Sequence, residues 1–360
     1  MKITVVGAGI VGCAVAHELA SRGASVHVVD MRGTGRGATQ ASAGMLAPYI
    51  EGHHDALRRI GVRSLEMYEG FIARVSDDAK QSIEFERCGS LQVACSETEM
   101  MGLAMSARQL AHDDVVHELM AGHQARRLEA QLSVRVQSAL WLPQHAYVRA
   151  SELTSALAAA AAKRGVQFTV GAVEDICSTG TSVGVRTAAG IVESDAIVIA
   201  AGSWASGLPP KPPVKPIRGQ LLHLHFDRRP LSRIVWGSGC YLVPWRNGAL
   251  LVGATVEDVG FDETATASGV GHLLGSCNDL LTTTPEARFE TVRIGLRPGT
   301  PDELPLIGAS STMRGVYFAT GHYRNGVLLA PLTARLIGDL VIDGRRDPDL
   351  ELVRPDRFAM

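Results

Sequence analysis

An arginine in an apolar stretch is a side chain that could bind a carboxylate. Arg297 lies in "GLRPGT", next to Leu296 and Pro298. Its guanidinium fork matches a carboxylate with two parallel hydrogen bonds, which a lysine cannot offer. The apolar neighbours predict a partly buried charge, and such a charge needs a partner. The partner is either a small acidic substrate or a structural carboxylate such as Asp302 or Glu303.

Three glycines near the start of the chain have the spacing of a dinucleotide-binding loop. In "GAGIVG", Gly7 permits the tight turn, Gly9 lets backbone approach a pyrophosphate, and Gly12 allows a helix to pack closely on a strand. The N-terminus of that helix would offer free N–H groups to phosphates. Asp30 follows at the end of the next apolar run, where its carboxylate would accept the ribose hydroxyls. The alternative is a tight turn that binds nothing.

A second polar cluster occurs at a junction that reads as buried on both sides. The stretch "TGHYRNGVLLAP" places His322, Tyr323, Arg324 and Asn325 between a strand-like run and a helix-like run. Such residues either cap the helix or face a ligand. From the residues alone both interpretations stay open.

The elements that must position these groups follow from periodicity. Residues 2–6 and 25–30 predict buried strands and residues 10–23 a helix, which together form a β-α-β unit. The run "AIVIAAGSWAS" predicts a buried strand that ends in small residues, so backbone could lie against a cofactor there. Five prolines in residues 208–216 mark a domain boundary. Strands return after it, with a helix near 266–281.

Composition restricts the class of protein. The chain has 360 residues, 46% of them apolar, and a net charge of −2, which favours neither nucleic acid nor an anionic membrane as partner. Six scattered cysteines without a CxxC pair predict reduced thiols in a cytoplasmic protein. Glycines interrupt the apolar N-terminus, which predicts no signal peptide, and no run predicts membrane insertion. No metal is expected, since His223 and His225 have no third ligand nearby in sequence.

Four segments together resemble the D-amino-acid-oxidase-type family of FAD enzymes. They are the N-terminal fingerprint, "AGSWAS", "GLRPGTPDELPLIG" and "GHYRNGVLLAP". The segment "YLVPWRNGALLVGATVEDVGFDETAT" is similar to the glycine oxidase branch, associated with thiamine biosynthesis. The resemblance covers nearly the whole chain. It implies FAD held without a covalent bond, and the lack of any cysteine after Cys277 agrees with this.

The predicted fold class is α/β, with a Rossmann-like FAD-binding domain of the glutathione-reductase type and a second domain that contains a mixed antiparallel β-sheet. The FAD-binding domain is expected to be discontinuous, formed by residues 1–85, 145–214 and 297–360. The substrate-binding domain is expected to comprise residues 86–144 and 215–296.

The resemblance also implies the site residues. Arg297 and Tyr241 would hold the substrate carboxylate, with Arg324 as a second cation near the substrate or the flavin edge. On sequence alone, a strand tyrosine such as Tyr241 is more often core packing. The residues expected to contact the cofactor are Gly7, Ala8, Gly9, Ile10, Val11, Gly12, Asp30, Met31, Ala43, Gly44, Met45, Val173, Ala201, Gly202, Trp204, His322, Tyr323, Arg324, Asn325, Gly326, Val327 and Leu328.

Among these, the backbone of Val173 would lie against the adenine, and Met45 would border the pocket. The N–H groups after Asn325 would face the pyrimidine edge of the flavin. Two positions depart from the family pattern. Asp30 replaces a glutamate that many members carry, and Trp245 stands where a basic residue is expected. We expect Trp245 to alter the pocket mouth and hence substrate choice.

The implied activity is oxidative deamination of glycine or a similar small amino acid, such as sarcosine or a small D-amino acid. Hydride transfer to flavin N5 would give an imine, then a 2-oxo acid and ammonia, and O2 would be reduced to H2O2. No side-chain base is required, which fits the lack of an obvious catalytic histidine or glutamate. The alternatives are a D-amino acid dehydrogenase using a quinone or other acceptor, a non-catalytic flavin-bound assembly protein, and an NAD-dependent enzyme. A homo-oligomer, commonly a tetramer in the family, is expected.

Overall fold

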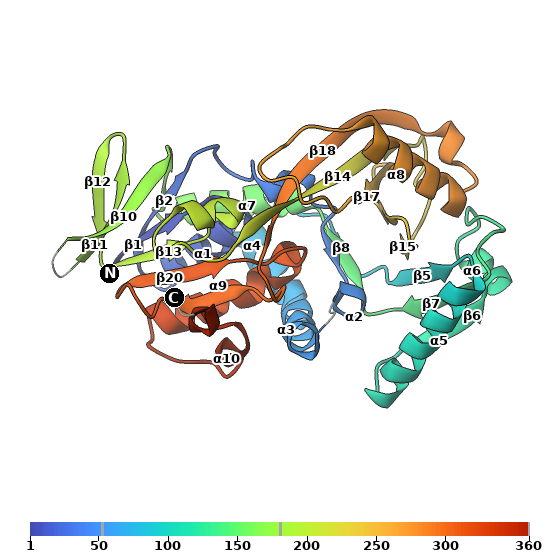
Figure 1. Ribbon diagram of the computed structural model, residues 1–360, viewed down its shortest axis with the longest axis horizontal. Coiled ribbons are helices and arrows are strands. Elements are labelled where there is room, and N and C mark those ends of the chain that lie inside the picture. The colour runs from blue at the N-terminus through green and yellow to red at the C-terminus, as the bar shows by residue number, and fades with distance from the viewer. Residues whose placement is uncertain (52–53, 180–181, 359–360) are drawn as a thin grey trace.

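Two large β-sheets with their own helices make up most of the protein, and both chain ends lie beside the first sheet (Figure 1). The structure is a computed structural model that describes residues 1–51, 54–179 and 182–358. The sequence predicts that the pair His53–His54 lies in a solvated loop. His54 is exposed, and His53 lies outside the described residues.

The first sheet has six strands, five of them parallel, and its core strands are the apolar runs seen in the sequence. Strands buried on both faces of a parallel sheet need apolar residues throughout rather than in alternation. In β1, Ile3 lies between Val26 and Ala196 of its two neighbours. In sheet order the strands are β19 (Leu306–Ala309), β20 (Val316–Thr320), β13 (Ala196–Ile199), β1 (Lys2–Val6), β2 (Ser25–Asp30) and β9 (Gln167–Val170), with β19 antiparallel to β20.

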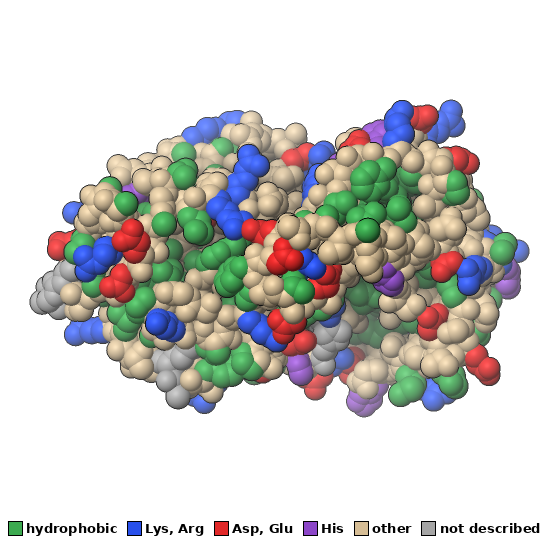
Figure 2. Space-filling model, turned by 45° about the horizontal axis from the view of Figure 1, so that its top comes forward, with side chains coloured by type: hydrophobic (Ala, Val, Ile, Leu, Met, Phe, Trp, Pro, Cys, Tyr) green, Lys and Arg blue, Asp and Glu red, His purple; other side chains and the backbone are tan. Residues whose placement is uncertain are grey.

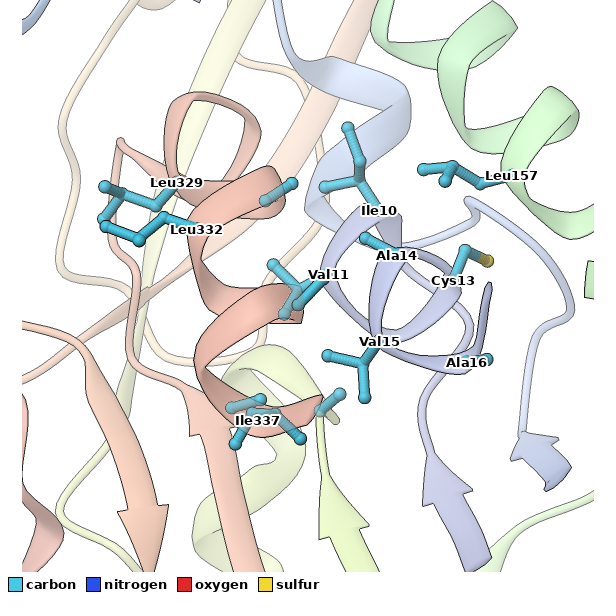
Figure 3. Packing of buried hydrophobic residues seen from close by; sticks show 14 of the residues in the cluster. Ile10, Val11, Cys13, Ala14, Val15, Ala16, Leu157, Leu329, Leu332 and Ile337 are labelled. Carbon is cyan, nitrogen blue, oxygen red and sulfur yellow. The ribbon is translucent and has the colours of Figure 1, made fainter. Parts of the chain in front are cut away.

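Helices cover one face of this sheet. Helix α1 (Ile10–Ser21) packs between α7 (Ala150–Lys163) and α9 (Gly326–Val341), so apolar residues cover it almost all round (Figure 3). Two further helices, α3 (Asp55–Glu66) and α4 (Tyr68–Ala79), pack on α9 and α7 respectively. The predicted β-α-β unit is therefore present, and its helix starts at the glycine fingerprint.

A three-stranded antiparallel sheet covers the other face. Its strands are β10 (Val173–Thr179), β11 (Ser182–Thr187) and β12 (Gly190–Ser194). Val183 and Val185 pack against Ile197 and Ile199 of β13 in a second apolar cluster. The six-stranded sheet is thus the middle layer of three.

The second large sheet has eight strands, and all its pairs are antiparallel except β5 with β15. Its two longest strands, β14 and β18, pair along most of their length. In sheet order the strands are β18 (Arg288–Gly299), β14 (Lys215–His225), β17 (Ala249–Gly253), β16 (Tyr241–Pro244), β15 (Ile234–Trp236), β5 (Ser90–Ala94), β7 (Ser138–Leu142) and β6 (Glu118–Ala121). Helix α8 (Ala267–Leu280) packs on β14 and β17, and α5 (Glu97–His112) on β5 and β7.

The predicted fold class is confirmed by these two sheets. The exact domain boundaries stay a prediction, and β18 runs unbroken across position 296/297. The remaining elements are the small sheet β3 (Met45–Leu46), β8 (Ala146–Val148) and β4 (Phe85–Glu86), the helices α2 (Pro48–Glu51), α6 (Gly122–Leu128) and α10 (Leu350–Val353), and the 3-10 turns η1 (Ala38–Ala41), η2 (Gly202–Gly207), η3 (Thr284–Glu286) and η4 (Pro355–Phe358).

Charges of both signs are interspersed over the surface shown in Figure 2. Within residues 1–51, 54–179 and 182–358, no helix combines the length and the apolar character needed to cross a bilayer.

Candidate active site

A long cavity lies where the six-stranded sheet meets the eight-stranded sheet. Its floor is the carboxyl end of four parallel strands, represented by Gly7, Asp30, Ala201 and Thr320. Ligands of open α/β sheets bind at this edge, because the loops that leave the strands diverge there. Residues of β14, β16 and β18, Arg297 among them, form the opposite wall. The sheet topology therefore brings the sequence-predicted fingerprint and the predicted substrate arginine to one cavity.

The three fingerprint glycines serve different needs. A Cβ on Gly7 would collide with the carbonyl of Ala200, and its φ of +110° also favours glycine. A Cβ on Gly12 would collide with the carbonyl of Gly7. Gly9 lines the cavity, and the nearest atom to its hypothetical Cβ is Thr39 Oγ1 at 3.4 Å. Packing within the protein thus requires glycine at positions 7 and 12, whereas the space beside Gly9 is open to the cavity.

The first turn of α1 opens onto this part of the cavity. Gly9 is the N-cap and has no side chain to satisfy the free N–H groups. Ile10 N donates to Thr39 Oγ1 over 3.1 Å, and both Ile10 and Val11 line the cavity. Sequence reasoning missed Thr39, which lies in a long glycine-rich loop without periodicity. The helix end forms an anion-binding corner beside Gly9.

The Asp30 carboxylate organises the loop around it. Its Oδ2 accepts from Ala8 N at 2.7 Å, and its Oδ1 accepts from Arg32 N at 2.7 Å and Gly33 N at 2.8 Å. Asp30 also lines the cavity, so lone pairs remain for a ligand hydroxyl. The shorter aspartate is therefore anchored by backbone N–H groups at the position predicted for the ribose.

The far end of the cavity is formed by residues that follow β2 and β13 and by the first residue of β10. Met31, Val173 and Trp204 line it, as predicted from the sequence. Arg32, which sequence reasoning missed, places its guanidinium carbon 4.3 Å from the centre of the Trp204 ring and pairs with Glu263 at 2.7 Å. Glu263 belongs to the connection between β17 and α8, so that connection reaches the mouth of the cavity at this end.

The middle of the cavity is bordered by small residues. Ala43, Gly44 and Met45 line it from one side, and Ala201 and Gly202 from the other. Gly44 has a φ of +74°, and a Cβ there would collide with the carbonyl of Val148 in β8. The close approach of β3 and β8 therefore explains the glycine.

The junction between β20 and α9 faces the cavity through part of its length. His322, Tyr323 and Arg324 line it, as do Gly326 and Val327 in the first turn of α9. Asn325 is the N-cap residue, but its side chain makes no capping hydrogen bond. Simple helix capping therefore does not account for this cluster. The free N–H end of α9 points toward the cavity and favours negative charge there.

His322 is buried, with 3% of its surface exposed, and its Nε2 pairs with Thr333 Oγ1 at 2.9 Å. Burial lowers the pKa of His322 to about 3, because the charged ring would lose its hydration. The unfolded chain binds this proton near the ordinary value of 6.5. Stability contributed by the neutral ring is therefore present above pH 6.5 and is lost as the pH falls toward 3.

Replacing His322 by glutamine is expected to weaken this pH dependence. When the pH falls from about 6 to about 4.5, the free energy of unfolding should decrease by about 1 to 2 kcal/mol less in the variant than in the wild type. One buried neutral histidine accounts for about 1.4 kcal/mol per pH unit in this range. Urea unfolding with saturating FAD measures this difference. His123→Gln, at an exposed position, is the matched control. Equal slopes for wild type and the His322 variant would contradict the assignment.

Arg297, in β18, lies at the end of the cavity away from the glycine fingerprint and is half-buried. Its Nη1 donates to the carbonyls of Thr255 at 2.9 Å and Arg218 at 3.4 Å. Asp302, one structural partner considered from the sequence, pairs instead with Arg357 at 2.7 Å. Across residues 1–51, 54–179 and 182–358, no carboxylate forms a salt bridge with Arg297. The guanidinium therefore faces the cavity without a carboxylate of the protein.

Tyr241 lines the same end of the cavity from β16. Its ring stacks on Trp236 with ring centres 5.3 Å apart, so it also packs against its neighbours. Arg324 lines this end too, and its guanidinium carbon lies 5.5 Å from the centre of the Tyr323 ring. The three predicted catalytic residues, which lie far apart in sequence, thus border one cavity.

The expectation for Trp245 is wrong. Its side chain is 1% exposed and does not line the cavity. The guanidinium carbons of Arg149 and Arg293 lie 4.3 Å and 5.5 Å from the centre of its ring. Trp245 therefore fills the core below the site and stacks with cations, and it does not form the pocket mouth.

Four predicted cofactor residues do not line the cavity: Ala8, Gly12, Asn325 and Leu328. Ala8 reaches the site only through its N–H bond to Asp30, and Gly12 packs against Gly7. Leu328 belongs to the helix core, with 3% exposed. All other predicted site residues border the cavity, from the glycine fingerprint at one end to Arg297 at the other.

Comparison with known proteins shows the family of the chain. The family model described as "DAO: FAD dependent oxidoreductase" matches residues 2–340. A curated relative, the bifunctional protein ThiO/ThiG of Nostoc sp., is 36% identical over 353 residues, which are 96% of this chain and 53% of the relative. The chain thus spans about half the length of the three ThiO/ThiG relatives it matches.

Relatives named glycine oxidase match over most of their length. The glycine oxidase of Geobacillus kaustophilus is 30% identical over 347 residues, 94% of this chain and 92% of the relative. The crystal structure of glycine oxidase from that organism superposes with a TM-score of 0.95, covering 99% of each chain. L-proline dehydrogenase from P. horikoshii, at 23% identity and a TM-score of 0.88, shares the fold.

Proposed function

The chain belongs to the DAO family of FAD-dependent oxidoreductases, and on that premise we propose that it oxidatively deaminates glycine or a similarly small amino acid. The predicted cofactor, FAD, is the one that the family description names. The overall reaction would convert glycine, water and O2 into glyoxylate, ammonia and H2O2. The glycine oxidase relatives support this substrate class.

The cavity fits FAD by two features of its own. The space beside Gly9 is open to the cavity and is not filled by protein atoms. The N-termini of α1 and α9, with their free N–H groups, both line the cavity. Residues 9–11 would hold the pyrophosphate, Asp30 the ribose, and Val173 the adenine end. Gly326 and Val327 would face the flavin. FAD, when bound, supplies an acceptor for two electrons and the α-hydrogen of the substrate.

The single observation that carries the substrate class is the Arg297 guanidinium. It lies in the cavity wall with two backbone carbonyls on Nη1 and, within the described parts of the chain, no acidic partner. A partly buried cation without a counter-charge is costly, so it favours a bound carboxylate. Tyr241, at the same end of the cavity, would donate its hydroxyl to that carboxylate.

The protein's part in the reaction is binding and orientation. Arg297 and Tyr241 hold the acid end of the substrate, so its α-carbon is presented to the cofactor in one orientation. The free N–H groups at the N-terminus of α9 would stabilise negative charge on the part of FAD bound beside Gly326 and Val327. Met45 and Leu296 add apolar surface to the lining of the cavity.

Anaerobic mixing of the purified protein with a panel of amino acids tests this function. We expect glycine, and less strongly sarcosine and small D-amino acids, to bleach the visible flavin absorbance. Production of H2O2 in air would identify an oxidase. Bleaching without H2O2 would instead identify a dehydrogenase that uses a quinone or other acceptor. No bleaching by any small amino acid would refute the proposal.

We further propose that the protein is a cytoplasmic homo-oligomer, as the family resemblance implies. Size-exclusion chromatography with light scattering measures its mass against the 38.3 kDa of one chain. A mass near 38 kDa at micromolar concentration would contradict the oligomer.

A further inference from the structure

We propose that Gly219 and Gly253 are positioning residues that set where Arg297 and Tyr241 present their polar groups to the substrate carboxylate. The inference rests on the proposed function, because it concerns the same carboxylate site. The two glycines lie in the neighbouring strands β14 and β17, and their backbone contacts the side chains of Arg297 and Tyr241.

Gly219 lies under the Arg297 guanidinium. In the pairing of β14 with β18, Arg297 lies opposite Ile217, so Gly219 is its diagonal neighbour on the same face. A Cβ on Gly219 would lie 2.5 Å from both Cζ and Nη1 of Arg297, and closer still to Nη2. Three atoms of the fork at nearly equal distance mean that its flat face rests on the bare backbone of Gly219.

Gly253 plays the same part for Tyr241. The two residues lie directly opposite each other in β17 and β16. A Cβ on Gly253 would lie 2.5 Å from Cζ and Oη of the tyrosine. Gly253 also lies opposite Leu221, two residues from Gly219, so both glycines belong to one patch of the sheet. Neither has a positive φ, so a left-handed backbone conformation does not explain glycine at these positions.

The edge of the guanidinium is fixed as well as its face. Arg297 Nη1 donates to Thr255 O at 2.9 Å and to Arg218 O at 3.4 Å. The Arg218 side chain is 3% exposed and pairs with Glu257 and Asp262, which anchors the connection that carries Thr255. In the described residues neither Nε nor Nη2 of Arg297 has a hydrogen-bond partner. The glycine below and the carbonyls beside Nη1 therefore leave Nε and Nη2 as the two parallel donors for the ligand.

Glycine weakens a strand unless a close approach requires it. With alanine at 219 the guanidinium must rise or swing away, and the substrate carboxylate would move with it. A displacement on the order of 1 Å at a substrate-binding group can cost about 100-fold in rate. The two glycines thus tune substrate binding without touching the reacting atoms.

A double-mutant cycle between Gly219 and Arg297 tests the proposal. We expect Gly219→Ala to raise KM for glycine by about 10- to 100-fold and to lower the Tm, with FAD content unchanged. In the Arg297→Ala background the colliding side chain is gone. There, Gly219→Ala should leave KM unchanged and should not lower the Tm.

Matched variants separate positioning from general destabilisation. In the Tyr241→Ala background, Gly219→Ala should raise KM and lower the Tm as it does in the wild type. The reason is that a Cβ at position 219 collides with Arg297 and not with Tyr241. Gly271→Ala, in helix α8 with no atom near its Cβ position, should leave KM unchanged and should not lower the Tm. If Gly219→Ala does not fold, the Gly253→Ala and Tyr241→Ala cycle decides the question by the same criterion.

Additive effects in both cycles would overturn the proposal. Failure of the proposed function looks different, because glycine would then not bleach the flavin of the wild-type protein and no KM for glycine could be measured. The double-mutant cycle in Tm measures the contact between Gly219 and Arg297 without any substrate. Failure of the positioning proposal can therefore be distinguished from failure of the proposed function.

Discussion

Replacing Arg297 by alanine is expected to raise KM for glycine by about 100- to 10,000-fold while the purified protein stays yellow. Two charge-assisted hydrogen bonds to the substrate carboxylate would be lost, each worth about 1.5 to 3 kcal/mol, and about 1.4 kcal/mol corresponds to a factor of ten. Flavin should stay bound because Arg297 lies at the opposite end of the cavity from the glycine fingerprint. Steady-state kinetics and the FAD content of the purified variant measure both effects.

The lysine variant of Arg297 distinguishes charge from geometry. Lysine keeps the charge but not the two parallel donors, so it should recover only part of the affinity. Arg314→Ala, which removes an exposed arginine, serves as the control and should leave KM unchanged. An Arg297→Ala variant with the KM of the wild type would show that the substrate carboxylate binds elsewhere.

Replacing Gly9 by valine is expected to abolish retention of FAD. The valine side chain would project into the space beside the N-terminus of α1, where the pyrophosphate is expected. The FAD-free fold should survive, since Gly9 has φ −69° and ψ 179°, an extended conformation open to any residue. The nearest protein atom to its Cβ position is Thr39 Oγ1, at 3.4 Å.

Absorbance after gel filtration and calorimetric titration of the apoprotein with FAD measure this effect. Gly102→Val, the same change in α5 with no atom near the Cβ position, is the matched control and should keep its flavin. A circular-dichroism spectrum like that of wild-type apoprotein would show that Gly9→Val is folded. A fully yellow Gly9→Val protein would place the pyrophosphate away from this loop.

The part of the site that sequence predicted well is local. Gly7, Gly12 and Asp30 belong to one β-α-β unit, so their spacing along the chain sets their spacing in space. The junction at His322–Asn325 was recognised as unusual, but the residues alone did not separate a helix cap from a ligand site. The structure favours the ligand site, since Asn325 makes no capping bond and its neighbours line the cavity.

The errors arose where long-range packing decides. Trp245 was expected at the pocket mouth, but Arg149 and Arg293, distant in sequence, enclose its ring. Asp302 was a candidate partner of Arg297 because it is near in sequence, yet it pairs with Arg357 from the end of the chain. Proximity in sequence does not determine which carboxylate forms an ion pair with a given arginine, because the path of the loops decides which groups lie together in the folded chain.

By itself the sequence determined a dinucleotide-binding β-α-β unit, an apolar middle sheet and an arginine suited to a carboxylate, because these follow from short-range periodicity and residue chemistry. Only the tertiary structure decided that Arg297 lies above Gly219 and faces the cavity. Those two residues are 78 positions apart, and the register of β14 against β18 brings them together. A strand register is set by the fit of two whole surfaces, and no local pattern in either strand specifies it.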